Sequence, residues 1–216
     1  MKLNKVLALA LSGVMAVSML AGCSGNPGNG GQDDQGQEVV TNSVAAKVND
    51  ELSDANKKKI TFTDDADLEK NLTDAVTLNG LVSLPQAAKV QVTMNDLTGL
   101  KETDYTNMTS NKTAKEYEVM LVRASTANVT PITAMDNFMK EVNTWVSAMP
   151  YAASGSTTYA DADALENAKL AEGTVYTQYS YTGSVAMVQA TNYAGTSVQY
   201  YFVVTIAQSA TTAVAD

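Results

Sequence analysis

Three pairs of acidic residues separated by one residue stand out in the chain, because such pairs can hold a cation or divide acid and base roles. Two of the pairs, Asp65/Asp67 and Asp161/Asp163, resemble the opening of a calcium-binding loop. A loop of that kind needs glycine at its sixth position, where this chain has a lysine and a glutamate respectively. We interpret both pairs as acidic residues at helix starts, where carboxylates stabilise the N-terminal turn, and we expect no metal site.

The third pair, Glu116 and Glu118, falls on a predicted strand. Its Cα atoms would lie about 6.6 Å apart at a rise of ~3.3 Å per residue, and the carboxylates of inverting glycosidases lie about 6.5 to 9.5 Å apart. Any acidic pair at this spacing on a strand meets that condition, and Lys115 precedes this one. A solvated strand end is therefore the favoured interpretation, and a carboxylate-based glycan hydrolase is the less favoured alternative.

Composition removes most other catalytic chemistry. The chain contains no histidine and a single cysteine, Cys23. Histidine-based zinc sites and Ser–His or Cys–His nucleophiles are therefore excluded. After the first 22 residues no lysine has a serine three positions before it, so a Ser-x-x-Lys acyl-transfer motif is absent as well. We expect no cofactor and favour a protein that is not an enzyme.

The first 23 residues follow the pattern of a secretory signal. Residues 1–5 carry positive charge, and residues 6–20 are apolar apart from two serines. That run is shorter than the ~20 residues that cross a bilayer. It closes on Leu20-Ala21-Gly22-Cys23, which resembles the lipobox of bacterial prolipoproteins.

The lipobox resemblance implies that a peptidase cuts before Cys23 and that at least two fatty acyl chains are attached to it. Two chains anchor a protein stably, whereas one binds marginally. We therefore expect a signal peptide over residues 1–22, a lipidated cysteine with a flexible Gly-rich tether over residues 23–38, and a lipid-anchored protein at the extracytoplasmic face of the cell membrane. Ser24 stands where an aspartate would retain a Gram-negative lipoprotein in the inner membrane. The style of the tether favours a Gram-positive envelope.

The charge balance bears on the partners. Loss of Lys2 and Lys5 with the signal leaves 12 basic against 23 acidic residues, a net charge of −11. Nucleic-acid binding needs clustered Lys and Arg to neutralise phosphates, so nucleic acid is excluded as a partner. A basic patch for anionic lipid is excluded for the same reason, and the membrane is expected to be reached through the lipid on Cys23.

Residues 39–209 are expected to form one α+β domain, followed by a tail over residues 210–216. Apolar residues at helical spacing, with caps and acidic first turns, predict four helices. Their ranges are 42–54, about 64–79, 131–149 and one that begins near Asp163 and ends at Gly173.

Alternating apolar residues and turn signals predict the strands. We place them over residues 89–94, 117–124, 174–182, 185–190 and 198–207, with turns at Gly183-Ser184 and at residues 192–195 and a loop from Asn95 to Thr113. The strand 117–124 is expected in the centre of the sheet, and Arg123 at its end is expected to pair with an acid. The C-terminal strands form an antiparallel meander with one buried face, which the helix 131–149 covers.

Six of the ten tyrosines lie between Tyr176 and Tyr201. Tyrosine suits a contact surface because it offers apolar area and a hydroxyl with little entropy to lose, so we predict such a surface at Tyr179, Tyr181 and Tyr201. We favour a non-enzymatic binding or scaffold module for an envelope protein or glycan, with a cell-envelope assembly or chaperone-like accessory as the alternative. The layout resembles uncharacterised surface lipoproteins of Gram-positive bacteria, a resemblance that implies no activity.

Overall fold

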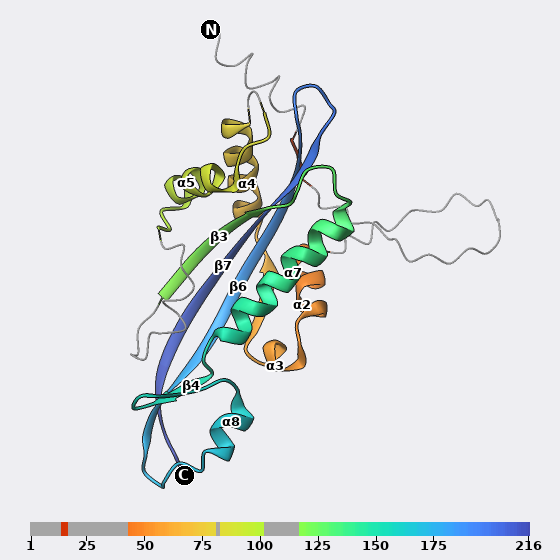
Figure 1. The fold of residues 1–216 in the computed structure, drawn as a ribbon. Helices are drawn as coiled ribbons and strands as arrows, with labels where there is room; N and C mark the ends of the chain where they lie inside the picture. The colour runs from red at the N-terminus through yellow and green to blue at the C-terminus, as the bar shows by residue number, and fades with distance from the viewer. Residues whose placement is uncertain (1–13, 17–42, 81–82, 102–116) are drawn as a thin grey trace, which may run out of the picture.

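A computed structural model describes residues 14–16, 43–80, 83–101 and 117–216 of the chain. Its central feature is a long antiparallel hairpin of two 17-residue strands, β6 (Val175–Thr191) and β7 (Val198–Val214). The strands pair along their whole length (Figure 1). The predicted turn over residues 192–195 connects them, and the Asn192 side chain accepts hydrogen bonds from the N–H groups of Thr196 and Ser197. The lipobox, the tether and Glu116 lie outside the described residues.

The other strands lie along the two edges of this hairpin. β3 (Tyr117–Ala124) pairs antiparallel with β7. The far edge of β6 is shared by β2 (Ile60–Asp64), which is parallel to it, and by β4 (Ala152–Ser154) and β1 (Val14–Ala16), which are antiparallel to it. A short strand, β5 (Thr157–Tyr159), pairs with β4. The prediction that residues 117–124 are central was wrong, because β3 is the outer strand in the sheet order.

The turn predicted at Gly183-Ser184 does not exist, because β6 runs straight through it. A Cβ atom on Gly183 would lie 2.5 Å from two ring carbons of Phe62 on β2. Glycine is therefore needed here for a close approach between a strand backbone and an aromatic ring. The predicted meander is accordingly one hairpin.

The predicted tail was also wrong over most of its length. Residues 210–214 belong to β7 and pair with the start of β6, from Val175↔Val214 to Tyr179↔Ala210. Their small and polar side chains give weak strand propensity, and the partner strand supplies the hydrogen bonds that hold them extended. Beyond them, the Ala215 N–H still donates to the Thr174 carbonyl at 2.9 Å.

The helix expected over residues 131–149 is confirmed as α7 (Pro131–Ala148), which begins at a Thr130 cap followed by proline. Its apolar stripe packs on one face of the sheet. The Phe138 ring stacks on Phe202 of β7 with centroids 4.4 Å apart, and Trp145 meets Phe138 edge-on at 6.4 Å. The fold is therefore a single α+β domain in which this helix covers the C-terminal strands, as expected.

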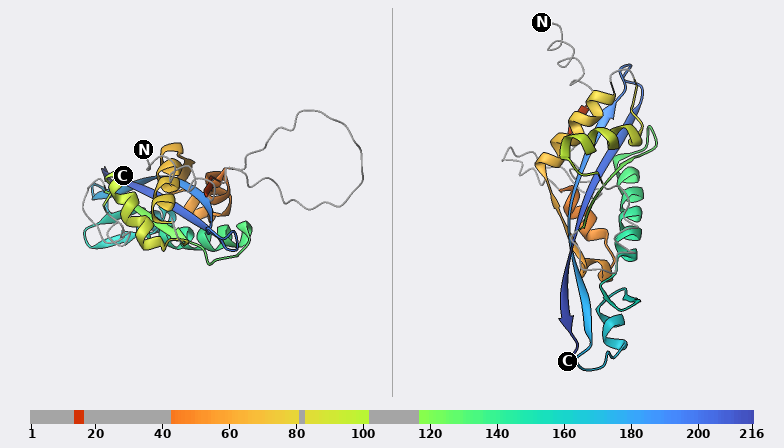
Figure 2. Two further views of the ribbon diagram at one scale, coloured as in Figure 1. Left: turned by 90° about the horizontal axis from the view of Figure 1, so that it is seen from above. Right: turned by 90° about the vertical axis from the view of Figure 1, so that its left-hand side faces the viewer.

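Two further helices, α4 (Ala66–Asn79) and α5 (Ala87–Thr98), cover one end of the opposite face. Figure 2 shows them across the hairpin from α7. The strand predicted over residues 89–94 was wrong, since these residues belong to α5. Val90 and Met94 are four residues apart and buried, while Val92 between them is 62% exposed, which is the pattern of a helix with one apolar stripe.

The remaining helices are short. The helix expected over residues 42–54 divides into α2 (Val44–Glu51) and α3 (Asp54–Lys57), each with a serine cap. The helix expected near Asp163 is α8 (Ala162–Asn167), whose cap is Asp161 and which ends well before Gly173.

Candidate functional site

The predicted tyrosine surface is buried. The exposed fractions of Tyr179, Tyr181 and Tyr201 are 3%, 6% and 0%. The Tyr181 hydroxyl donates to the Pro150 carbonyl at 2.7 Å, and the Tyr201 hydroxyl donates to the Pro85 carbonyl at 2.7 Å. Burial raises the pKa of both hydroxyl groups. The prediction of a contact surface on these three residues was therefore wrong, and they belong to the core instead.

The reason for the error lies in the second face of the sheet. Tyr179 and Tyr181 point to the face under α7, while Tyr201 points to the opposite face, under α4 and α5. A strand with one solvated face would have exposed Tyr201. Tyr201 is covered by α4 and α5 near the β6–β7 turn, and Tyr179 and Tyr181 are covered on the α7 face nearer the other end of the hairpin, so none of the three reaches the surface.

The accessible part of the sheet is lined by hydroxyl groups instead. Beyond the ends of α4 and α5, the sheet bears an open depression of about 490 Å³. We call it the hydroxyl face, and its lining side chains are those of Thr61, Thr63, Thr182, Ser184, Thr205, Ala207 and Glu118.

Strand register places these side chains in two rows across the sheet. One row runs from Thr61 through Thr182 and Ala207 to Glu118, and the next begins with Thr63. The Thr63 Oγ1 atom lies 3.4 Å from the Ser184 Oγ. Neighbouring strands are ~4.8 Å apart, so the hydroxyls form a closely spaced polar lattice. The alternation of residue types along β6 and β7 could have predicted this face, but only if the ends of the covering helices α4 and α5 had been known.

Among the described residues, Glu118 is the one charged residue that lines the hydroxyl face. Its partner in the predicted acidic pair, Glu116, lies outside the described residues. Across the strands Glu118 is opposite Ala207, and no second carboxylate lines this depression. The described part of this face therefore lacks the two converging acids that glycoside hydrolysis uses.

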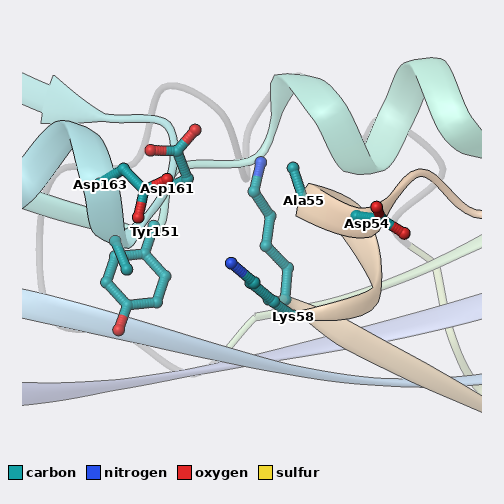
Figure 3. Close-up of a pocket in the computed structure, with 8 residues that line it drawn as sticks. Asp54, Ala55, Lys58, Tyr151, Asp161 and Asp163 are labelled. Carbon is teal, nitrogen blue, oxygen red and sulfur yellow. The ribbon is translucent and has the colours of Figure 1, made fainter.

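A second candidate site, the lysine–aspartate pocket, lies between the α3–β2 junction and the start of α8. It has a volume of about 220 Å³, and its lining is Asp54, Ala55, Lys58, Lys59, Tyr151, Asp161, Ala162 and Asp163. Figure 3 shows Asp161 and Asp163 on one side of it, Lys58 on the other and the Tyr151 ring beside them. No single stretch of sequence predicts this pocket, because about 100 residues separate its two walls.

The lysine wall is attached to α7. Asn56 in α3 is buried, and its Nδ2 donates to the Asn143 carbonyl at 3.1 Å and to the Ser147 Oγ at 3.0 Å. The Lys59 ammonium donates to the Val146 carbonyl at 3.2 Å and to the Met149 carbonyl at 3.1 Å. These carbonyls end α7, where a cation is favoured. Burial lowers the pKa of Lys59, and the Asp161 carboxylate opposes that shift.

The acidic pairs act as helix starts. Asp161 accepts from the Ala164 N–H at 2.7 Å, and Asp65 accepts from the N–H groups of Asp67 and Leu68. This capping role is the one expected from the sequence. Across the described ranges no cluster of three or more metal-ligating side chains occurs.

Arg123 also has the role expected of it. Its Nε atom pairs with the Glu141 carboxylate at 2.9 Å, and the guanidinium lies 5.0 Å from the Trp145 ring centroid. This cation–π contact joins the end of β3 to α7.

Comparison with known proteins found no match for this chain among protein-family models, curated proteins or solved structures. Among the described residues no helix is both long enough and apolar enough to span a membrane.

Proposed function

We propose that this chain is a lipid-anchored extracytoplasmic binding module whose hydroxyl face binds an uncharged glycan of the cell envelope. The observation that carries the proposal is the hydroxyl face itself: an open depression of about 490 Å³ lined by four threonines, a serine and one carboxylate. The lipobox at Cys23 and the tether that follows it support the location.

The chemistry of the hydroxyl face complements sugars. A serine or threonine hydroxyl both donates and accepts hydrogen bonds, as a sugar hydroxyl does. These short side chains have little rotamer freedom to lose on binding. The face repeats its hydroxyls across β2, β6 and β7, so an extended polymer of repeating units can contact several of them at once.

Charge argues for a neutral ligand. Within the described part of the chain, Glu118 is the single charged group of the hydroxyl face, and it repels polyanions. The chain as a whole has a net charge of −9, which disfavours approach of anionic envelope polymers at long range. An uncharged polysaccharide is repelled neither by Glu118 nor by the net charge of the chain.

Two variants in the centre of the face test the glycan proposal. Thr182→Lys and Thr205→Lys place a bulky cation over the hydroxyl rows, and each should weaken retention of the detergent-solubilised acylated protein on purified neutral envelope glycan at least tenfold. Thr144→Lys is the matched control, because Thr144 is an exposed threonine of α7 on the other side of the sheet. Equal retention of all four proteins would refute the proposal.

The same assay separates the alternatives. Glycan turnover that disappears in Glu118→Gln would identify a hydrolase rather than a binding module. Capture of an envelope protein in place of glycan, lost in the two lysine variants, would identify an assembly or chaperone-like accessory.

The anchor has its own test. Cys23→Ala should abolish acylation, globomycin-sensitive processing and partition into the detergent phase, because the chain has no other thiol. Cleavage before Cys23 also removes β1 from the edge of β6, while β2 to β7 follow the cut and remain. A Cys23→Ala protein that still partitions into detergent at the mature size would refute lipid anchoring.

A further inference from the structure

Opposite charges face each other across the lysine–aspartate pocket without forming an ion pair. In residues 43–80, 83–101 and 117–216, the ion pairs within 4.0 Å are Lys70–Asp74 and Arg123–Glu141. Neither pocket lysine is in that set, although Asp161 is close enough to Lys59 to influence its pKa. The cavity of about 220 Å³ lies between the two walls.

Two of these charges are held in place by structural roles. The Lys59 ammonium is bound to the last carbonyls of α7, and the Asp161 carboxylate caps α8. Neither can cross the pocket to neutralise the other without giving up these hydrogen bonds to the backbone, which are stronger because one partner is charged. The separation of charge is therefore a built feature of the fold.

The remaining charges are those of Asp54, Lys58 and Asp163. Asp54 lies in the first turn of α3, on the lysine side of the pocket, and the other two are available to a ligand. Lys58 and Asp163 are exposed, and within the described ranges neither side chain has a hydrogen bond or ion pair. Figure 3 shows them on opposite sides of the pocket, with the Tyr151 ring beside them.

We propose that the lysine–aspartate pocket binds a small zwitterion, a molecule with an α-ammonium and a carboxylate, such as a free amino acid or a dipeptide. The ligand carboxylate binds Lys58, and Lys59, whose ammonium donates to three carbonyls at the end of α7, contributes its charge alone. The ligand ammonium faces Asp161 and Asp163. Such complementarity of charge gives specificity. A simple anion is repelled by the aspartates and a simple cation by the lysines, whereas a zwitterion satisfies both walls.

The size of the pocket limits the ligand. Its volume is below the ~300 to 1,000 Å³ of sites for drug-sized molecules. A second pocket of about 230 Å³ shares Lys58, Lys59 and Tyr151 and continues along the edge of β6 from Gln178 to Tyr181. β4 pairs with β6 up to Gln178, the Tyr179 N–H donates to the Tyr151 carbonyl at 3.0 Å, and β2 begins its pairing at Tyr181, so the gap between them is confined to Ser180. The second pocket offers room for a side chain or a second residue of a dipeptide.

Ligand-observed NMR and titration calorimetry on the full-length acylated protein in detergent test this proposal. The probes are alanine, the dipeptide Ala-Ala, and two blocked forms, N-acetylalanine without the ammonium and alaninamide without the carboxylate. We expect at least one zwitterion to bind about tenfold or more tightly than either blocked form. Tighter binding of alanine would indicate that the ligand is a free amino acid. Tighter binding of Ala-Ala would indicate that it is a dipeptide.

The site variants are Lys58→Gln and Asp163→Asn, because within the described ranges neither side chain has a hydrogen bond or ion pair to lose. Each should weaken zwitterion binding about tenfold, the usual effect of losing one charged hydrogen bond. Lys140→Gln and Asp136→Asn on the exposed side of α7 are the matched controls and should leave binding unchanged. Equal binding of zwitterions and blocked forms, equal binding by site and control variants, or no binding at about 10 mM probe would each overturn the proposal. Thr205→Lys should leave zwitterion binding unchanged, so failure of the zwitterion proposal can be distinguished from failure of the glycan proposal.

Discussion

The two faces of the β6–β7 hairpin are built from alternate residues of the same strands, yet they differ along their length. Under α7, β7 contributes an apolar row from Val198 to Ile206. On the opposite face the apolar row ends at Val203, and Thr205 begins the hydroxyl face. The change occurs where α4 and α5 stop covering the sheet. Residues of one face are thus apolar where a helix packs on them and hydroxylated where none of the described helices does.

Truncation of the aromatic stack under α7 should have the largest effect. Phe138→Ala removes a buried ring that stacks on Phe202 and should lower the free energy of unfolding by about 3 to 5 kcal/mol. The midpoint of urea denaturation measures it. Ile132→Ala, on the exposed side of the same helix, is the control and should change stability by about 0.5 kcal/mol or less. A loss below about 1 kcal/mol for Phe138→Ala would mean that α7 contributes little to the core.

A methyl group at Gly183 tests the close approach of β2 on the α7 side. The Cβ of Gly183→Ala would meet the Phe62 ring at 2.5 Å, and we expect a loss of about 1 to 3 kcal/mol from overpacking. Ser184→Ala, whose side chain points to the hydroxyl face, should be close to neutral by the same denaturation measurement. Equal stability of the two variants would show that Phe62 can move away at no cost.

The boundary on the second face can be tested by exchanging residues across it. Val203→Thr buries a hydroxyl beneath α4 and α5 and should cost about 1 to 3 kcal/mol. Thr205→Val, two residues further along the same face and partly exposed, should change stability by about 0.5 kcal/mol or less. If the two substitutions have similar effects on the urea midpoint, the faces do not differ in the way described.

Each face buries one tyrosine that is hydrogen-bonded to a proline carbonyl, which predicts loss of stability at alkaline pH. The pKa of Tyr181 and of Tyr201 is raised by burial, so above pH ~10 the unfolded chain releases these protons while the folded chain keeps them. Stability should then fall as pH rises, by up to about 1.4 kcal/mol per pH unit for each tyrosine.

The tyrosine prediction is checked by urea titrations between about pH 8 and 11. Tyr181→Phe and Tyr201→Phe should each flatten the alkaline fall while costing about 1 kcal/mol at pH 7 for the lost hydrogen bond. Tyr193→Phe is the control, because Tyr193 is 84% exposed. An unchanged slope in both core variants would contradict the assignment.

The smallest expected effect is a gain in stability from a substitution at Gln208. Gln208 is 1% exposed under the α7 face, and both polar atoms of its amide are unpaired within the described part of the chain. Gln208→Met should therefore stabilise the fold by about 1 kcal/mol, since an unpaired buried amide costs roughly 1 to 3 kcal/mol. Gln199→Met should instead destabilise it, because the Gln199 amide bonds to the Ser125 carbonyl and lies 2.8 Å from the Tyr201 hydroxyl. A loss of stability in Gln208→Met would show that its amide has a partner.

Much of the secondary structure was predictable where the spacing of apolar residues fitted a helix or a strand but not both. The stripe of α7 extends over five turns with a cap and a proline at its start, so a helix was the single consistent interpretation. β3 and the first half of β7 were equally clear from their alternation. These elements alone indicated the α+β class and the packing of α7 on the C-terminal strands.

Short segments were decided by their surroundings. Val90, Val92 and Met94 fit a strand by alternation, and Val90 and Met94 also fit one face of a helix. Val90 and Met94 are buried in the core that α4 and α5 form with the sheet, which resolves the ambiguity. Gly183 favoured a turn by residue type, but packing against Phe62 requires glycine for another reason.

The sequence by itself determined the inventory: no histidine, one cysteine within a segment that resembles a lipobox, and an acidic chain with amphipathic elements. Tertiary structure alone decided which polar residues are accessible together. Tyr179 and Tyr181 are buried on the α7 face and Tyr201 is buried beneath α4 and α5, whereas the hydroxyl face is open because α4 and α5 stop short of it. The lysine–aspartate pocket joins residues near position 58 to residues near position 161. Local periodicity reports on neighbours along the chain, whereas burial and convergence depend on contacts between segments that are far apart in sequence.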